Sequence, residues 1–137
     1  MKRREFIKDC GIFCVSGIGL ALFLESCKTI FYAPNVLTGD TLIIKKSDFA
    51  THSFVVVKNE KLQAPIYLNK RKENEYSAVL MLCTHKGCEL NTAGNNLICP
   101  CHGAEFSNTG KVLNPPANED LKKYQVTNDN ENIYIHL

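Results

Sequence analysis

Apolar and polar residues alternate in short runs along most of the chain, and this pattern predicts strands rather than helices. Runs rich in Val, Ile, Leu and Tyr are separated by Asn, Asp, Gly, Lys and Pro turn signals. The runs predicted as strands are 41–45, 53–58, 64–69, 77–82, 96–99, 111–113, 121–127 and 132–136. No stretch of ten or more residues after Cys27 has a clean 3.6-residue period. The pattern therefore predicts an all-β domain of about 100 residues.

Three short polar segments between these runs are typical of hairpin tips: Asn59-Glu60, Gly94-Asn95 and Asn128-Asp129-Asn130. Residues 28–40 contain Pro34 and Gly39 and few apolar residues after Tyr32, so residues 27–40 are predicted to form a linker. The folded domain is then expected to span residues 41–137.

The first 26 residues follow a different pattern. Four basic residues (Lys2, Arg3, Arg4 and Lys8) precede the uncharged segment 11–24. This segment is shorter than the roughly 20 residues of a membrane span, and it matches the apolar region of a signal peptide. We therefore predict that residues 1–26 are a signal peptide, and an uncleaved membrane anchor or a buried helix is the alternative.

Two local motifs refine this prediction. Arg3-Arg4-Glu5-Phe6-Ile7-Lys8 resembles the twin-arginine export signal. Leu24-Glu25-Ser26-Cys27 resembles the lipobox of bacterial lipoproteins, although Glu25 departs from the small or apolar residue usual there. These resemblances imply an exported protein on the periplasmic side of a bacterial membrane, anchored through lipid on Cys27.

Composition narrows the class of partner. The chain has 137 residues, of which 45% are hydrophobic and 22% charged, so one small domain with a packed core is expected. Its 16 Lys and Arg residues nearly balance its 14 Asp and Glu residues. Without a dominant basic field, nucleic acid is not expected as a partner.

Candidate metal ligands gather in two short segments within residues 83–106. The first segment is Cys83-Thr84-His85-Lys86-Gly87-Cys88, and the second is Cys99-Pro100-Cys101-His102-Gly103-Ala104-Glu105-Phe106. Thiolates and imidazoles select zinc, copper or iron–sulfur groups over magnesium and calcium. Four cysteines and two histidines exceed what one tetrahedral ion needs. Each segment contributes at least one cysteine and one histidine. This division favours a two-iron cluster with two thiolates on one iron and two imidazoles on the other, and a zinc or structural disulfide site remains the alternative.

The paired motif is similar to the two cluster-binding loops of Rieske iron–sulfur proteins, in the branch that contains a disulfide. This resemblance implies an antiparallel β-sandwich with a small subdomain that carries the two loops and a [2Fe–2S] cluster. It also implies a third, proline-containing loop, matched by residues 110–116. Carried over residue by residue, the implied cluster ligands are Cys83, His85, Cys99 and His102, and the implied disulfide joins Cys88 to Cys101.

Some positions depart from the family pattern. Respiratory members commonly have Ser and Tyr hydroxyls that hydrogen-bond sulfur atoms of the cluster site, where this chain has Ala104 and Phe106. Lys86 follows the first-loop histidine, where quinol-oxidising members often have an apolar residue. Only 13 residues separate His85 from Cys99, so a tight hairpin is expected between the loops. His52 and His136 lie outside the motif and are expected at the surface.

The function implied is one-electron transfer by a redox subunit or carrier, with no catalytic residue assigned. Its partner would be a redox protein, such as a cytochrome or an oxidoreductase subunit. The alternatives are the Rieske subunit of a quinol-oxidising or menaquinol-oxidising cytochrome bc-type complex, a soluble Rieske ferredoxin component, and a zinc-binding structural protein.

Overall fold

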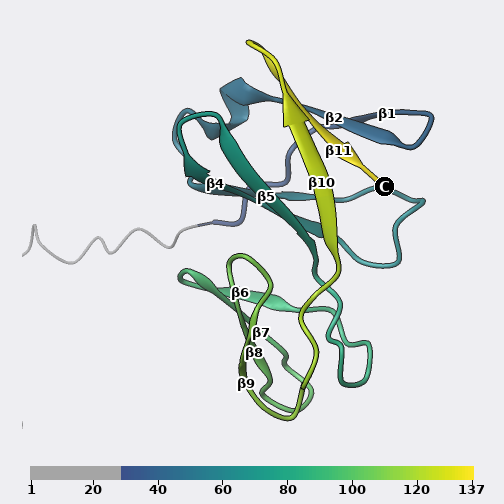
Figure 1. Cartoon of the computed structure of the whole chain (residues 1–137), viewed down its shortest axis with the longest axis vertical. Coiled ribbons are helices and arrows are strands. Elements are labelled where there is room, and N and C mark those ends of the chain that lie inside the picture. Colours follow the sequence, from purple (N-terminus) through teal and green to yellow (C-terminus); the bar gives the residue numbers. More distant parts are fainter. Residues whose placement is uncertain (1–28) are drawn as a thin grey trace, which may run out of the picture.

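The computed structural model describes residues 29–137 (Figure 1). The predicted signal peptide and the predicted lipidation site, Cys27, therefore lie outside the described residues. Within residues 29–137, none of the helices has the length and apolar character needed to cross a membrane.

The described chain is built almost entirely from strands, which confirms the all-β prediction. One short 3-10 helix, η1, covers Lys46–Phe49. The strands are β1 (Val36–Thr38), β2 (Thr41–Lys45), β3 (Phe54–Val57), β4 (Ile66–Lys72), β5 (Glu75–Leu80), β6 (Asn91–Ala93), β7 (Asn96–Ile98), β8 (Glu105–Ser107), β9 (Val112–Asn114), β10 (Lys123–Asn128) and β11 (Asn132–His136).

The strands form two antiparallel sheets (Figure 1). The larger sheet has seven strands in the order β1-β2-β11-β10-β5-β4-β3, and the smaller has four in the order β6-β7-β8-β9. In Figure 1 the smaller sheet lies below the larger one. The smaller sheet is inserted between β5 and β10, which pair directly with each other. It is therefore a subdomain carried by the larger sheet.

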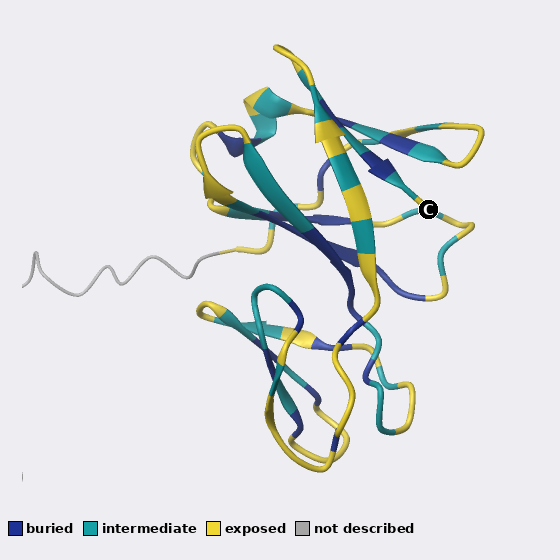
Figure 2. Cartoon of the chain, viewed as in Figure 1, coloured by how far each residue is buried: buried dark blue, intermediate teal, exposed yellow. Residues whose placement is uncertain are grey.

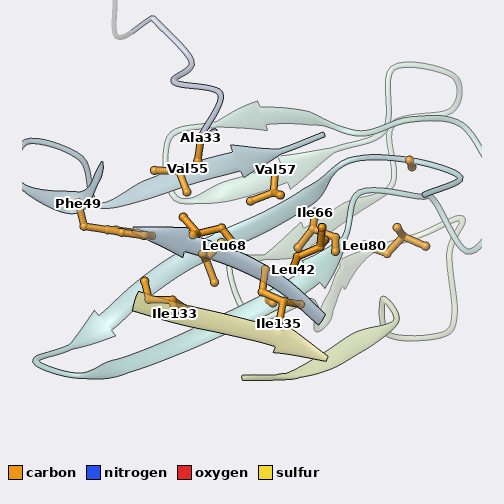
Figure 3. Close-up of a cluster of buried hydrophobic side chains, with 13 residues drawn as sticks. Ala33, Leu42, Phe49, Val55, Val57, Ile66, Leu68, Leu80, Ile133 and Ile135 are labelled. Atoms are coloured by element: carbon orange, nitrogen blue, oxygen red, sulfur yellow. The ribbon is translucent and has the colours of Figure 1, made fainter. Parts of the chain in front are cut away.

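Strands β3, β4 and β5 each contain consecutive buried apolar residues. Because successive side chains of a strand point to opposite sides, both faces of these strands are apolar. One face packs on β2 and β11 (Figures 2 and 3). This first core contains Leu42, Ile44, Val55, Val57, Ile66, Leu68, Ala78, Leu80, Ile133 and Ile135, among others. The other face packs on the smaller sheet and contributes Val56, Tyr67 and Val79 to a second core. The middle layer therefore supports both the larger sheet and the subdomain.

Gly110 lies in the turn between β8 and β9, where the smaller sheet touches β5 of the larger one. Its φ of +82° is one that side chains disfavour, and a Cβ atom there would lie 2.9 Å from Cγ1 of Val79. Its carbonyl accepts a hydrogen bond of 2.8 Å from the Leu121 N–H. The absence of a side chain at Gly110 thus lets the turn between β8 and β9 approach β5 closely.

Each predicted hairpin tip lies in the connection between two paired antiparallel strands, β3–β4, β6–β7 or β10–β11, and the tight connection between the two motif segments is the β6–β7 hairpin. Ala93 pairs with Asn96 across Gly94-Asn95, and Gly94 has a φ of +60°. The strands β6 and β8 were not predicted, since each has only three residues and little apolar alternation.

The chain joins the fold earlier than the sequence predicts. Residues assigned to a linker include β1, which pairs with β2 around a turn at Gly39-Asp40. Tyr32 also forms a parallel bridge with Val56 of β3. These contacts were missed because β1 is three residues long and the segment contains Pro34 and Gly39, which are typical of loops.

Candidate metal centre

The first motif segment forms a closed loop at residues 83–88. The Cys83 N–H donates to the Cys88 carbonyl at 2.8 Å, and the Gly87 N–H donates to the Cys83 carbonyl at 2.8 Å. Gly87 has a φ of +74°, with no atom within 4 Å of where a Cβ would lie. Glycine is therefore favoured there by backbone conformation rather than by lack of space.

The second segment repeats this geometry at residues 99–104. The Cys99 N–H donates to the Ala104 carbonyl at 2.8 Å, and the Gly103 N–H donates to the Cys99 carbonyl at 3.0 Å. Gly103 has a φ of +77°. The two loops thus present their first cysteines in equivalent backbone settings, although they carry the histidine at different positions.

The first cysteines of the two loops, Cys83 and Cys99, are free thiols buried in the second core. Burial raises the pKa of the Cys83 thiol, and the backbone N–H groups of His85 and Lys86 oppose this only in part. Burial also opposes ionisation of Cys99, but N–H groups of His102 and Cys101 outweigh it and lower its pKa. Each loop therefore directs two backbone donors at a sulfur that can become a thiolate.

The two histidines of the loops face each other. The ring centroids of His85 and His102 lie 4.9 Å apart with an angle of 83° between the ring planes. Nδ1 of His85 is buried and has no hydrogen-bond partner. A buried polar atom without a partner is costly, and a metal ion is one group that would satisfy it.

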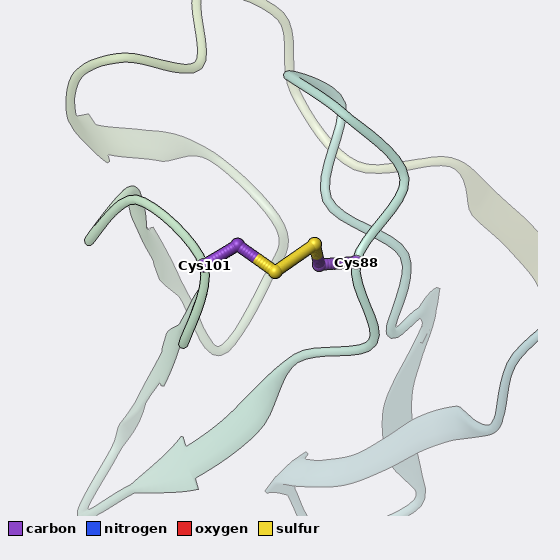
Figure 4. Close-up of a disulfide and its surroundings, with 2 residues drawn as sticks. All are labelled: Cys88 and Cys101. Atoms are coloured by element: carbon purple, nitrogen blue, oxygen red, sulfur yellow. A yellow bond between two sulfur atoms is a disulfide. The ribbon is translucent and has the colours of Figure 1, made fainter.

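The disulfide implied by the family resemblance is present. Cys88 and Cys101 are bonded with their Cα atoms 6.5 Å apart, which ties one loop to the other (Figure 4). The sulfur of Cys99 lies within 4.8 Å of both disulfide sulfurs. Because those two sulfurs are bonded to each other, this group offers one thiolate and is not a three-thiolate metal site.

The donor set fits a two-metal group better than a single zinc ion. Within residues 29–137, no three of the four predicted ligands bring their donor atoms within 4.8 Å of one another. Ligands around one tetrahedral zinc ion would lie about 4 Å apart, given Zn–S and Zn–N bonds of roughly 2.0–2.3 Å. Two buried thiols and two facing imidazoles spread over a larger space are what a [2Fe–2S] cluster with mixed ligands requires.

The positions that depart from the family pattern surround this site. Ala104 and Phe106 are fully buried in the second core beside Cys99. Lys86 is exposed at the tip of the first loop.

A contact that sequence reasoning missed joins the first loop to the segment after the proline-containing loop. The Thr84 hydroxyl donates to the Glu119 carbonyl at 2.8 Å. Nothing in the sequence pattern indicated that pair.

The other two described histidines have partners outside the loops. His52 stacks on Phe31 with ring centroids 4.7 Å apart. His136 has its two ring nitrogens 3.3 Å and 2.9 Å from the hydroxyls of Thr41 and Thr127. Neither histidine belongs to the candidate centre.

Comparisons with known proteins agree on one family. The family model of the Rieske [2Fe-2S] domain matches residues 40–125. The cytochrome b6-f complex iron-sulfur subunit of Synechococcus sp. (strain CC9605) is 35% identical over 75 residues, which cover 52% of this chain and 42% of that protein. The same subunit of Chlorobaculum thiosulfatiphilum is 38% identical over 66 residues, covering 47% and 36%. The matches thus span less than half the length of these curated relatives.

Solved structures show the same fold. The plasma membrane Rieske protein PetC3 from Synechocystis PCC 6803 is 33% identical, with a TM-score of 0.59, and the match covers 68% of this chain and 95% of that one. A chain from the complex of oxygenase and ferredoxin in carbazole 1,9a-dioxygenase is 21% identical with a TM-score of 0.52, covering 69% and 92%. The second likeness concerns the fold alone.

Replacing Cys88 with serine should leave a metal centre that assembles but decays faster, because the two loops are no longer tied. For a ring of this size, loss of the disulfide lowers the free energy of unfolding by roughly 3 kcal/mol. Iron content and visible absorption, followed over time in Cys88→Ser and in the double variant Cys88→Ser/Cys101→Ser, measure the decay. Complete loss of iron from freshly purified Cys88→Ser, with an altered spectrum, would instead identify Cys88 as a ligand.

Proposed function

The chain belongs to the Rieske [2Fe-2S] family, and from this membership we propose that it transfers single electrons as a redox subunit or carrier. We assign the cluster ligands to Cys83, His85, Cys99 and His102. The observation that supports this assignment best is the unpartnered, buried Nδ1 of His85, in a ring that packs edge-on against the ring of His102 from the other loop.

A bound [2Fe–2S] cluster would supply one-electron exchange. Histidine ligation raises its reduction potential above that of all-cysteine clusters. Cys83 and Cys99 would bind as thiolates, and the backbone N–H groups directed at their sulfurs stabilise that charge. Ligation through Nδ1 would leave Nε2 of His85 to hold or release a proton. His102 is exposed and His85 half-buried, so this edge of the site is open to a partner.

The partner we propose is a redox protein, either a cytochrome or an oxidoreductase subunit. Two versions follow from different observations. Sequence identity of 35% and 38% to cytochrome b6-f iron-sulfur subunits favours a subunit of a quinol-oxidising complex. The exposed charge of Lys86 at the loop tip favours a carrier or subunit that does not insert this tip into an apolar quinol site.

The location we propose is the outer side of the cytoplasmic membrane. The twin-arginine-like start and the apolar segment 11–24 support export, and the lipobox-like sequence before Cys27 supports a lipid anchor. Export of a folded protein fits a group that is loaded before translocation.

Loss of one proposed ligand should abolish the cluster, because the loops offer no free thiol or imidazole besides the four proposed ligands. His85→Ala and Cys99→Ser should each lose the reduced-state electron paramagnetic resonance signal and most of the iron. His52→Ala is the matched control and should keep both. If either ligand variant retained the wild-type signal, the ligand assignment would be overturned.

The reduction potential should be lower than in family members that have hydroxyls near the cluster. Hydrogen bonds to cluster sulfurs stabilise the more negative, reduced state. Ala104→Ser and Phe106→Tyr should each raise the midpoint by about 40–90 mV, if one bond to a charged acceptor contributes about 1–2 kcal/mol. Voltammetry at pH 7 measures this shift.

Two buried positions in the first core provide controls for this measurement. Ala78→Ser and Phe49→Tyr introduce the same hydroxyls away from the loops and should leave the midpoint unchanged. Unchanged midpoints in all four variants would mean that neither Ala104 nor Phe106 faces a cluster sulfur.

Membrane attachment should depend on lipid at Cys27. Cys27→Ser protein should leave the membrane fraction, because stable anchoring needs acyl chains on this residue. Fractionation and the mass of the mature N-terminus measure the outcome. Membrane-bound Cys27→Ser protein with residues 1–26 intact would establish an uncleaved anchor instead.

A further inference from the structure

The outward face of the segment that enters the fold is unusually apolar. From Ile30 to Thr38 the residues alternate strictly, with even positions exposed and odd positions partly or fully buried. The apolar residues on the exposed face are Ile30, Tyr32, Pro34 and Val36, which we call the N-terminal stripe. Three of the five large apolar side chains exposed in the described chain belong to it, with exposed fractions of 41%, 50% and 64%.

The stripe is held firmly on the domain. The Ala33 N–H donates to the Val56 carbonyl, and the Val56 N–H donates to the Phe31 carbonyl, both at 2.9 Å. Ala33 is buried, and Phe31 packs against the first core. The inward residues therefore fix the outward ones, and the apolar face is a feature of the folded domain.

The surface next to the stripe carries a cation. The Lys58 ammonium lies 4.7 Å from the centre of the Tyr32 ring. The outward face of β10, by contrast, presents Lys123, Gln125 and Thr127. Exposed aliphatic residues, a tyrosine and a lysine on one face are the combination that lies in the boundary layer between lipid and water.

The length of chain before the N-terminal stripe indicates what covers it. This inference rests on the N-terminal anchor proposed above. Phe31, where pairing with β3 begins, is four residue steps beyond Cys27. Fully extended, these steps span at most about 14 Å, close to the radius of gyration of a 100-residue domain, about 13 Å. An uncleaved anchor ending at Leu24 would allow only about 25 Å. Either anchor keeps the surface around Phe31 near the bilayer.

We propose that the N-terminal stripe and Lys58 lie on the phospholipid headgroup layer of the membrane that holds the N-terminal anchor. The domain is then held in one orientation. In Figure 1 the chain enters on the left, whereas the loop that follows β5 and carries Cys83–Cys88 lies at the lower right. This orientation leaves that loop accessible to a partner while the stripe is covered by lipid.

The chain contains no tryptophan, so a single introduced indole can report depth in the membrane. The full-length Tyr32→Trp protein is reconstituted into vesicles of phosphatidylcholine and phosphatidylglycerol at a molar ratio of about 3:1, with and without brominated phosphatidylcholine. Gln125→Trp is the control, because Gln125 is exposed on the outward face of β10, away from the stripe. Bromine should quench the indole at position 32 at least about twofold more than the one at position 125.

A second variant tests the apolar contact itself. Adding Ile30→Ser and Val36→Ser to Tyr32→Trp should bring quenching close to that of the control, while the visible spectrum of the cluster stays unchanged. If the protein sediments with vesicles but both indoles are quenched equally, the proposed orientation is overturned and the anchor stands. If the protein fails to sediment with vesicles, the anchor and the orientation both fail. Equal quenching with a dimer in light scattering would assign the stripe to a second copy of this chain.

Discussion

The geometry of the candidate centre depends on how the outer face of β3, β4 and β5 is covered. Val56, Tyr67 and Val79 point away from the first core and pack against the subdomain, in the same cluster of side chains as Cys83 and Cys99. Gly110 allows the turn between β8 and β9 to approach Val79 of β5 closely. The larger sheet therefore serves as a rigid base, and precise placement of ligands on short loops requires such a base.

On that base, two loops with the same backbone hydrogen bonds present different side chains. Each loop directs two N–H groups at its first cysteine, but the histidine follows two positions later in one loop and three in the other. The disulfide joins the remaining cysteines and restricts the separation of the loops. The site thus combines two thiols buried in the second core with two imidazoles nearer the surface, of which that of His102 is exposed.

Much of this arrangement could be predicted from the sequence. Long alternating runs such as those of β2 and β11 were placed correctly, because one buried face dictates a period of two. The resemblance of the paired motif to Rieske loops also implied the disulfide between Cys88 and Cys101, which the structure contains. The strands β1, β6 and β8 could not be predicted, since three residues carry too little pattern and depend on neighbours distant in sequence. The bond from Thr84 to Glu119 and the donors to the cysteine sulfurs likewise arise from tertiary geometry.

The central claim is that two imidazoles and two thiolates hold the cluster. Pulsed electron paramagnetic resonance on reduced protein, labelled with nitrogen-15 in histidine only, tests it most directly. The account predicts two strongly coupled histidine nitrogens, because His85 and His102 would both bind the iron that receives the electron. A reduced signal without strong histidine coupling would contradict it and indicate a cluster held by cysteines alone.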